Sequence, residues 1–125
     1  MQERRISIAA SDQRLTAVLG DTATADAVWS ALPIEAPANT WGDEIYFDTS
    51  VQAEEESDSR EVVDLGDIGY WPPGPSLCLF FGPTPMNRGD EIRPASAVNV
   101  IGKIDGDPTV LKRVRAGERV VIERA

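Results

Sequence analysis

Hydrophobic and polar residues alternate at both ends of the chain, and this alternation predicts strands. Ile6 and Ile8 are flanked by polar or small residues, as in a half-buried strand. A turn-rich cluster at 11–13 follows, and the alternation resumes over residues 15–19. Residues 119–123 repeat the pattern near the C-terminus. The chain is therefore predicted to open with a β-hairpin and to close with a strand.

A helical period replaces the alternation in two segments. Apolar residues recur at spacings of three and four from Ala25 to Leu32, which places them on one helical face. Pro33 ends this helix, because the residue before a proline disfavours the helical conformation. Trp29 lies on the apolar face and is predicted to be a core residue. Residues 108–115 predict a second, short helix.

Strand-like segments dominate the rest of the chain. Residues 34–40 form a weak candidate strand that Pro37 interrupts, whereas residues 44–47 are rich in strand-forming types. The apolar run 77–81 has the length of a buried strand, and 98–104 forms another with a glycine inside it. Together with the two helices, these short strands predict a single mainly β domain, either a barrel or a sandwich.

Aromatic, glycine and proline residues concentrate in the segment 66–85. Tyr70 and Trp71 precede a proline-rich turn, and two phenylalanines follow it. Such a segment fixes a loop and directs rings toward a common space, so it predicts where a ligand site would lie. If Tyr70 and Trp71 lie on a strand, only one of them faces that site.

Length and charge narrow the classes of protein and partner. A chain of 125 residues forms one domain, residues 1–125, whose core needs no disulfide or metal. Asp and Glu (21) outnumber Lys and Arg (12), and the net charge of -9 argues against nucleic acid and anionic membranes as partners. No signal peptide is recognised and no apolar run approaches the roughly 18 residues of a membrane helix, so a cytoplasmic location is expected. The single Cys78 lies in an apolar run and is expected to be a small core residue.

The residue types exclude several kinds of catalytic site. The chain has no histidine, which is the commonest general base and the commonest metal ligand. It also lacks a phosphate-binding loop of the Walker type and a dinucleotide-binding fingerprint. The acidic segment 54–61 lacks the ligand spacing of a calcium loop and is interpreted as a solvated loop. No metal and no cofactor is therefore expected.

Polar residues near the aromatic segment are candidates for ligand contacts. Glu44 and Tyr46 share one face of a predicted strand, where they either line a cleft or form an ordinary surface pair. Thr84 lies between two prolines that stiffen its backbone, so its hydroxyl either orients a ligand or satisfies a local amide. Asn99 interrupts an apolar strand, and its amide either contacts a ligand or belongs to a structural hydrogen-bond network.

Three motifs in order resemble a known family. Residues 66–74 read G-D-I-G-Y-W-P-P-G, residues 77–85 match L-x-x-F-F-G-P-T-P, and residues 99–102 read N-V-I-G. This set is similar to the small prokaryotic cyclophilin-like domain of uncharacterised function, and residues 24–32 resemble the first helix of cyclophilins. The resemblance implies a closed eight-stranded antiparallel barrel with two short helices, one at each end.

The same resemblance implies that the usual prolyl-isomerase machinery is missing. The positions of the catalytic histidine and glutamine of cyclophilins align with Val98 and Leu79, and the arginine falls near Glu44, whose charge is opposite. Phe81 keeps the apolar wall of the proline pocket. An isomerase needs a donor that stabilises a pyramidal imide nitrogen, and no such donor is evident.

The expected function is therefore ligand binding in a side cleft, with no catalytic residue assigned. The ligand is expected to be a small molecule or peptide-like, and not anionic because of Glu44. Two alternatives stay open: a weak peptidyl-prolyl cis-trans isomerase, and a subunit or regulator of a small-molecule enzyme that binds a protein partner. The predicted ligand contacts are Glu44, Tyr46, Trp71, Phe81, Thr84 and Asn99.

Overall fold

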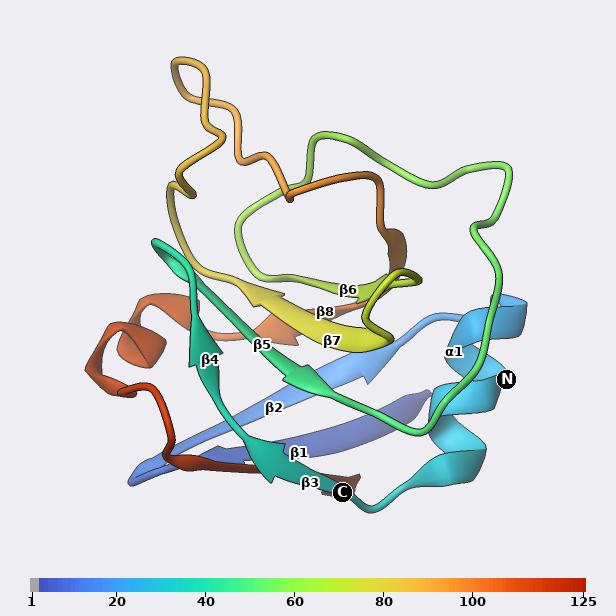
Figure 1. Cartoon of the computed structure of the whole chain (residues 1–125). Helices are drawn as coiled ribbons and strands as arrows, with labels where there is room; N and C mark the ends of the chain where they lie inside the picture. The colour runs from blue at the N-terminus through green and yellow to red at the C-terminus, as the bar shows by residue number, and fades with distance from the viewer. Residues whose placement is uncertain (1–2) are drawn as a thin grey trace.

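The computed structural model describes residues 3–125, which form one nine-stranded antiparallel sheet that curves into a nearly closed barrel (Figure 1). The strand order is β3-β9-β1-β2-β8-β6-β7-β5-β4. The elements in chain order are β1 (Arg4–Ala10), β2 (Gln13–Leu19), α1 (Ala23–Ala31), β3 (Ile34–Pro37), β4 (Asn39–Thr40), β5 (Glu44–Asp48), β6 (Asp67–Trp71), β7 (Ser76–Phe80), β8 (Asn99–Asp105), the short 3₁₀ helix η1 (Pro108–Arg113) and β9 (Arg119–Arg124).

The terminal strands confirm the predictions from hydrophobic alternation. β1 pairs with β2 in an opening hairpin, and β9 returns to pair with β1 on its other side. The inward positions Ile6 and Ile8 are each only 1% exposed. The two ends of the chain therefore build one continuous part of the barrel wall.

The barrel has nine strands rather than the expected eight, and it is nearly closed rather than fully closed. The weak segment 34–40 accounts for the difference, because it divides at Ala38 into β3 and β4. β3 pairs only with β9 and β4 pairs only with β5, so they are the two edges of the sheet. Pro37 has no backbone N–H to donate, so the segment 34–40 cannot form regular hydrogen bonds with neighbouring strands along both of its edges. The two edge strands, β3 and β4, are thus consecutive in the chain and are separated only by Ala38.

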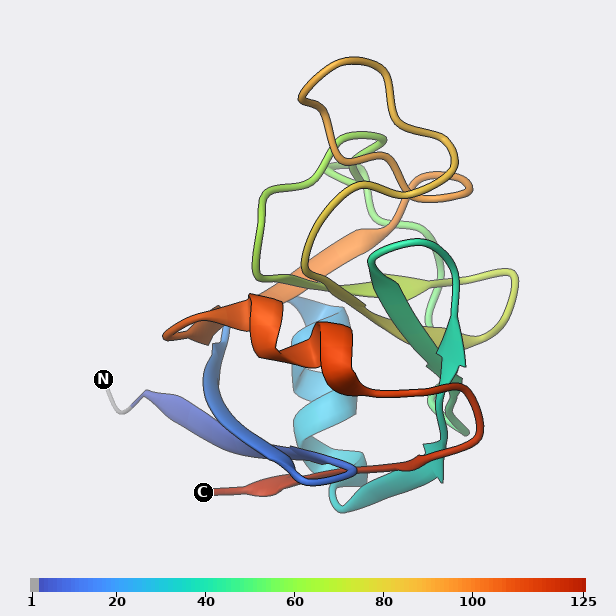
Figure 2. The same ribbon diagram turned by 90° about the vertical axis from the view of Figure 1, so that its left-hand side faces the viewer.

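Helices cover the two ends of the barrel, as the resemblance implied (Figures 1 and 2). On α1, Ala25 and Val28 pack into the interior cluster, while Trp29 is only partly buried and carries the Arg124 guanidinium 4.4 Å from its ring centre. At the other end η1 buries Leu111 completely. The second helix is thus present, as a 3₁₀ turn that ends two residues earlier than expected.

A second apolar cluster lies outside the barrel. The segments 49–66 and 81–98 cross the outer face of β5, β7, β6 and β8 (Figure 1). In this cluster, Val63, Ile92 and Val98 of the two segments pack on Cys78 and Phe80 of β7. Strand β7 is consequently buried at every position, which explains why its sequence is apolar throughout instead of alternating.

Two features bear on membranes and metals within residues 3–125. Neither helix in this range is long and apolar enough to cross a membrane. No group of three or more histidine, cysteine, aspartate or glutamate side chains in the same range is arranged to hold a metal ion.

Asn99 ties the acidic segment to the start of α1. Its Nδ2 donates to Thr24 Oγ1 (3.0 Å) and to the Glu54 carbonyl (2.9 Å), and its Oδ1 accepts from the Glu56 N–H (2.8 Å). Glu56 in turn accepts from the Thr24 N–H (3.0 Å), which places a carboxylate at the positive end of the helix dipole. Part of the segment expected to be a solvated loop is therefore anchored, and Asn99 serves the structural network.

We expect Asn99→Ala to lower the free energy of unfolding by about 2 to 3 kcal/mol, because it leaves buried partners without hydrogen bonds. Urea unfolding measures this change. Asn39→Ala is the matched control, since the exposed Asn39 donates only one bond, to the Tyr46 carbonyl at 3.3 Å. Equal losses in the two variants would contradict the structural role of Asn99.

Candidate functional site

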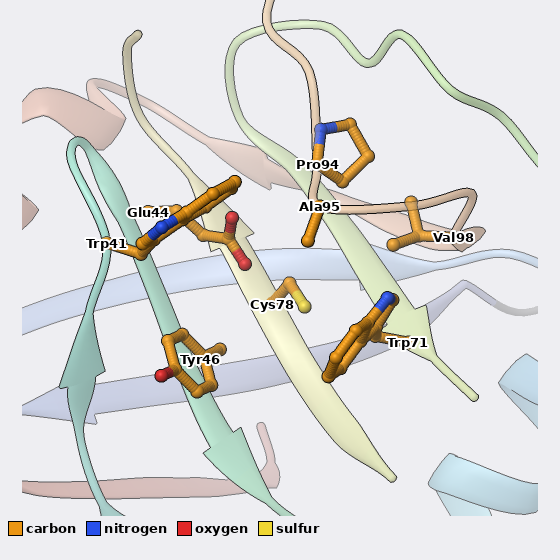
Figure 3. Close-up of a pocket in the computed structure, with 8 residues that line it drawn as sticks. All are labelled: Trp41, Glu44, Tyr46, Trp71, Cys78, Pro94, Ala95 and Val98. Carbon is orange, nitrogen blue, oxygen red and sulfur yellow. The ribbon is translucent and has the colours of Figure 1, made fainter. Parts of the chain in front are cut away.

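A pocket of about 210 Å³ opens on the outer face of the barrel, between the strands and the covering segment 81–98 (Figure 3). Its walls come from three strands, the β4–β5 turn and the covering segment. The residues that line it are Trp41, Glu44, Tyr46, Trp71, Cys78, Pro94, Ala95 and Val98.

Strand register assembles the floor of this pocket. Tyr46 on β5 and Gly69 on β6 both stand opposite Cys78 on β7, so the three positions share the outer face. A Cβ atom at Gly69 would lie 3.0 Å from a Val98 methyl carbon, so the missing side chain lets Val98 approach the sheet closely. The result is a shallow apolar floor with Cys78 at its centre.

Trp71 forms one wall and also holds the covering segment. It lies at the end of β6, where its Nε1 donates to Ser96 Oγ at 2.6 Å. Its neighbour Tyr70 points into the barrel, donates its hydroxyl hydrogen to the Val51 carbonyl (2.8 Å), and accepts from the Ala53 N–H. Of these two rings only Trp71 lines the pocket, as expected for neighbouring residues on one strand.

Trp41 forms the opposite wall, on the turn between β4 and β5. The backbone N–H of Trp41 donates to the backbone carbonyl of Glu44 (2.9 Å), and this hydrogen bond closes the turn. The next residue, Gly42, has a φ of +60°, and a Cβ there would lie 2.9 Å from both the Pro83 carbonyl oxygen and the Pro85 ring. The proline-threonine-proline segment therefore packs directly on this turn and fixes the position of Trp41.

Glu44 supplies the one carboxyl group of the pocket. It is 5% exposed, and its Oε1 is buried with no hydrogen-bond partner among the described residues. Burial raises the pKa of Glu44 from its ordinary 4.5 to about 7, and the neighbouring Cys78 thiol offsets part of this effect. Burial and the Glu44 charge also raise the pKa of Cys78 well above its usual value, so the thiol is neutral near pH 7.

Comparison with known proteins identifies the family to which this chain belongs. The family model described as Cyclophilin-like matches residues 4–123. The chain belongs to the cyclophilin-like family. A solution structure of the hypothetical protein AF2241 from Archaeoglobus fulgidus is similar at 49% identity, with a TM-score of 0.82, over 98% of this chain and 95% of that one. A search of curated proteins found no match to this chain.

Three of the six predicted contacts meet in the pocket of this cyclophilin-like barrel, and three do not. Glu44, Tyr46 and Trp71 line it. Thr84 is buried in the covering segment, where its hydroxyl donates to the Arg93 carbonyl and accepts from the Met86 N–H (3.2 Å). Asn99 belongs to the network at α1, and Phe81 lies in the barrel interior. Whether the three lining residues bind a ligand stays a prediction.

Phe81 lies in the barrel interior and does not form a wall of this pocket, contrary to what the resemblance implied. Phe81 and Leu79 both pack inside the barrel, whereas Cys78 and Phe80 face outward. Of this run, Cys78 lines the pocket, whereas Leu79 and Phe81 do not. A continuously apolar run has no alternation to reveal its faces, and an error of one residue exchanges them all.

Sequence patterns did not predict the remaining lining residues as ligand contacts; these are Trp41, Cys78, Pro94, Ala95 and Val98. Two of them had a signal in the sequence: Trp41 is a large ring in a Trp-Gly-Asp turn three residues before Glu44, and Val98 aligned with the catalytic histidine of cyclophilins. Pro94 and Ala95 come from a segment with no periodic pattern, so only tertiary packing places them over the sheet.

We expect pH to reveal the burial of Glu44. Between the unfolded pKa near 4.5 and the folded pKa of about 7, the unfolded state releases this proton while the folded state keeps it. Stability contributed by the protonated group is therefore lost as pH rises through 7. The free energy of unfolding of Glu44→Gln should gain about 2 to 3 kcal/mol over the wild type between pH 5 and pH 8.

Chemical denaturation across this pH range measures the difference. Glu55→Gln removes a carboxyl group from an exposed loop position and serves as the control, which should track the wild type. A difference between Glu44→Gln and the wild type that stays constant from pH 5 to pH 8 would show that the carboxyl is not desolvated.

We also expect the Gly42 turn to tolerate no side chain. Gly42 and Gly89 have φ angles of +60° and +59°, so alanine meets the same backbone strain at both sites, but nothing lies within 4 Å of a Cβ at Gly89. Gly42→Ala should cost at least about 1 kcal/mol more than Gly89→Ala, because it also forces the covering segment away. Urea unfolding of the two variants checks this, and equal costs would contradict the close packing.

Proposed function

We propose that this cyclophilin-like protein binds a small-molecule or peptide-like ligand in the outer pocket, without the usual prolyl-isomerase machinery. The observation that carries the proposal is the Glu44 carboxyl group, which is 5% exposed and has an unpaired buried oxygen directed into an apolar pocket (Figure 3). An unpaired buried polar group costs about 1 to 3 kcal/mol, and a ligand that donates a hydrogen bond to it recovers part of that cost.

The walls support the same proposal. Trp41, Tyr46 and Trp71 bring three rings around one polar group, the combination of apolar surface and few oriented polar atoms that is typical of ligand sites. The volume of about 210 Å³ is below the roughly 300 Å³ at which drug-sized sites begin. The proposed ligand, or the part of it that enters, is therefore small.

Peptidyl-prolyl isomerisation is the weaker alternative. The rings would accept a proline side chain, but the lining residues include no arginine, glutamine or histidine to stabilise a pyramidal imide nitrogen. Regulation of a small-molecule enzyme through a protein partner is the other alternative, and no lining residue favours it over ligand binding.

The three tryptophans allow a direct test by NMR. Trp41 and Trp71 line the pocket, while Trp29 lies on α1 outside it. A set of small neutral, cationic and anionic fragments should include members that shift the indole N–H signals of Trp41 and Trp71 and leave Trp29 unmoved. No shift of either pocket indole with any fragment would contradict the proposal.

A blocking variant sharpens the test. Ala95 is exposed and its methyl group points into the pocket, so Ala95→Trp should fill the space and reduce fragment binding at least tenfold (Figure 3). Ala116→Trp adds the same bulk at an exposed site outside the pocket and should leave binding unchanged. Isomerase activity on a proline peptide that Ala95→Trp abolishes would favour the alternative function.

A further inference from the structure

We propose that the ligand group entering the pocket is a protonated alkylamine, held by the Glu44 carboxylate and by the faces of Trp41, Tyr46 and Trp71. The inference rests on the proposed binding function and names the chemical class of the ligand. Its basis is a negative charge and three electron-rich rings in one pocket, with no basic side chain among the described residues that line it.

Within residues 3–125, no positive group is paired with Glu44. Its neighbours in the pocket are Tyr46 on the same strand and Cys78 on β7, and its pairing partner on β7 is the apolar Phe80. The nearby ionic side chains are engaged elsewhere. Lys112 lies 3.7 Å from Asp43 on the β4–β5 turn. Nη2 of Arg93, on the covering segment, lies 3.2 Å from Glu91, while the buried Nε of Arg93 has no hydrogen-bond partner among residues 3–125. The charge of Glu44 is therefore free to pair with a ligand.

The rings come from three separate elements and line the same pocket as the carboxyl group. Trp41 is on the β4–β5 turn, Tyr46 on β5 and Trp71 at the end of β6 (Figure 3). The face of an aromatic ring carries partial negative charge, so it attracts a cation within about 6 Å and disfavours an anion. Each such contact contributes about 0.5 to 2 kcal/mol, the larger value where water is excluded.

The rings also discriminate between the two ways in which Glu44 could bind a ligand. A protonated Glu44 could donate to a ligand carbonyl, and an ionised Glu44 could accept from a ligand ammonium group. A carbonyl oxygen would place negative charge against the ring faces, whereas an ammonium group is attracted by both the rings and the carboxylate. An amine with at least one N–H also gives a partner to the unpaired Oε1 of Glu44.

The two binding modes predict opposite pH dependence. An alkylamine stays protonated from pH 6 to pH 8, because its pKa lies near that of lysine, about 10.4. Glu44, with a pKa of about 7 in the free protein, is mostly protonated at pH 6 and mostly ionised at pH 8. Amine affinity should therefore rise about tenfold from pH 6 to pH 8, whereas affinity for a carbonyl ligand should fall.

The test compares cyclohexylamine, cyclohexanol and cyclohexanecarboxylate, which share a ring and differ in charge. The Trp41 and Trp71 indole signals report dissociation constants at pH 6 and pH 8. We expect cyclohexylamine to bind at least tenfold more tightly than cyclohexanol at pH 8, and the carboxylate most weakly. Acetyl-lysine amide with a free side-chain amine tests whether the group arrives on a peptide, and tighter binding of this probe than of cyclohexylamine would indicate a peptide ligand.

Variants separate the role of charge from that of shape. Glu44→Gln should weaken cyclohexylamine at least tenfold and remove the pH dependence, and should weaken cyclohexanol by a smaller factor, while Glu55→Gln should alter none of these. If cyclohexanol binds as tightly as the amine, and Ala95→Trp abolishes both, the pocket binds ligands but the amine inference is wrong. If no probe moves either pocket indole, the proposed function and the inference both fail.

Discussion

Strand β7 is buried on both of its faces, and the barrel and the pocket both depend on that burial. Leu77 and Leu79 pack in the barrel interior, while Cys78 and Phe80 pack beneath the covering segments. Fully burying a side chain of this size contributes about 1.5 to 3 kcal/mol, so one strand supports two apolar clusters. Because the outer face is covered, a polar group placed on it loses its contact with water. Glu44, opposite Phe80 on β5, is the group for which that loss matters most.

Among residues 3–125, Glu44 and Arg93 each hold one buried side-chain atom without a hydrogen-bond partner, and the double burial of the sheet explains the Glu44 case. The buried Asn99, Asp67 and Tyr70 all have protein hydrogen-bond partners, as buried polar groups normally do. The Oε1 of Glu44 has none. Groups that break the rules of polar satisfaction and carry a shifted pKa concentrate at functional sites. The unpaired oxygen and the raised pKa of Glu44, more than the fold, therefore mark the outer pocket as the candidate site.

Membership of the cyclophilin-like family describes the scaffold rather than the chemistry. A shared barrel carries many functions, and activity depends on the side chains at a particular site. Here the covering segment, the Gly42 turn and the Trp71–Ser96 hydrogen bond shape the pocket, and its chemistry comes from one carboxyl group among rings. Among the motif glycines, Gly69 lets Val98 approach the sheet at this pocket, whereas Gly66 and Gly102 pack against other parts of the barrel.

Much of the fold could be read from local patterns, because local patterns record which face of each element is buried. Alternation predicted β1, β2 and β9, helical spacing predicted α1, and the family motifs predicted a barrel. The shared face of Glu44 and Tyr46 also followed from strand alternation. The division of residues 34–40 into two edge strands did not, since the hydrogen-bond partners of each half come from distant parts of the chain.

The sequence by itself thus determined the class of fold, the acidic surface and the presence of aromatic rings around residues 66–85. Only the tertiary structure decided which residues meet. The apolar run 77–81 has no alternation, so its register, which places Cys78 and not Phe81 at the pocket, depends on pairing with β5 and β6. The burial of Glu44 likewise depends on the covering segment, which brings Pro94 and Ala95 over the sheet by contacts between residues far apart in the chain.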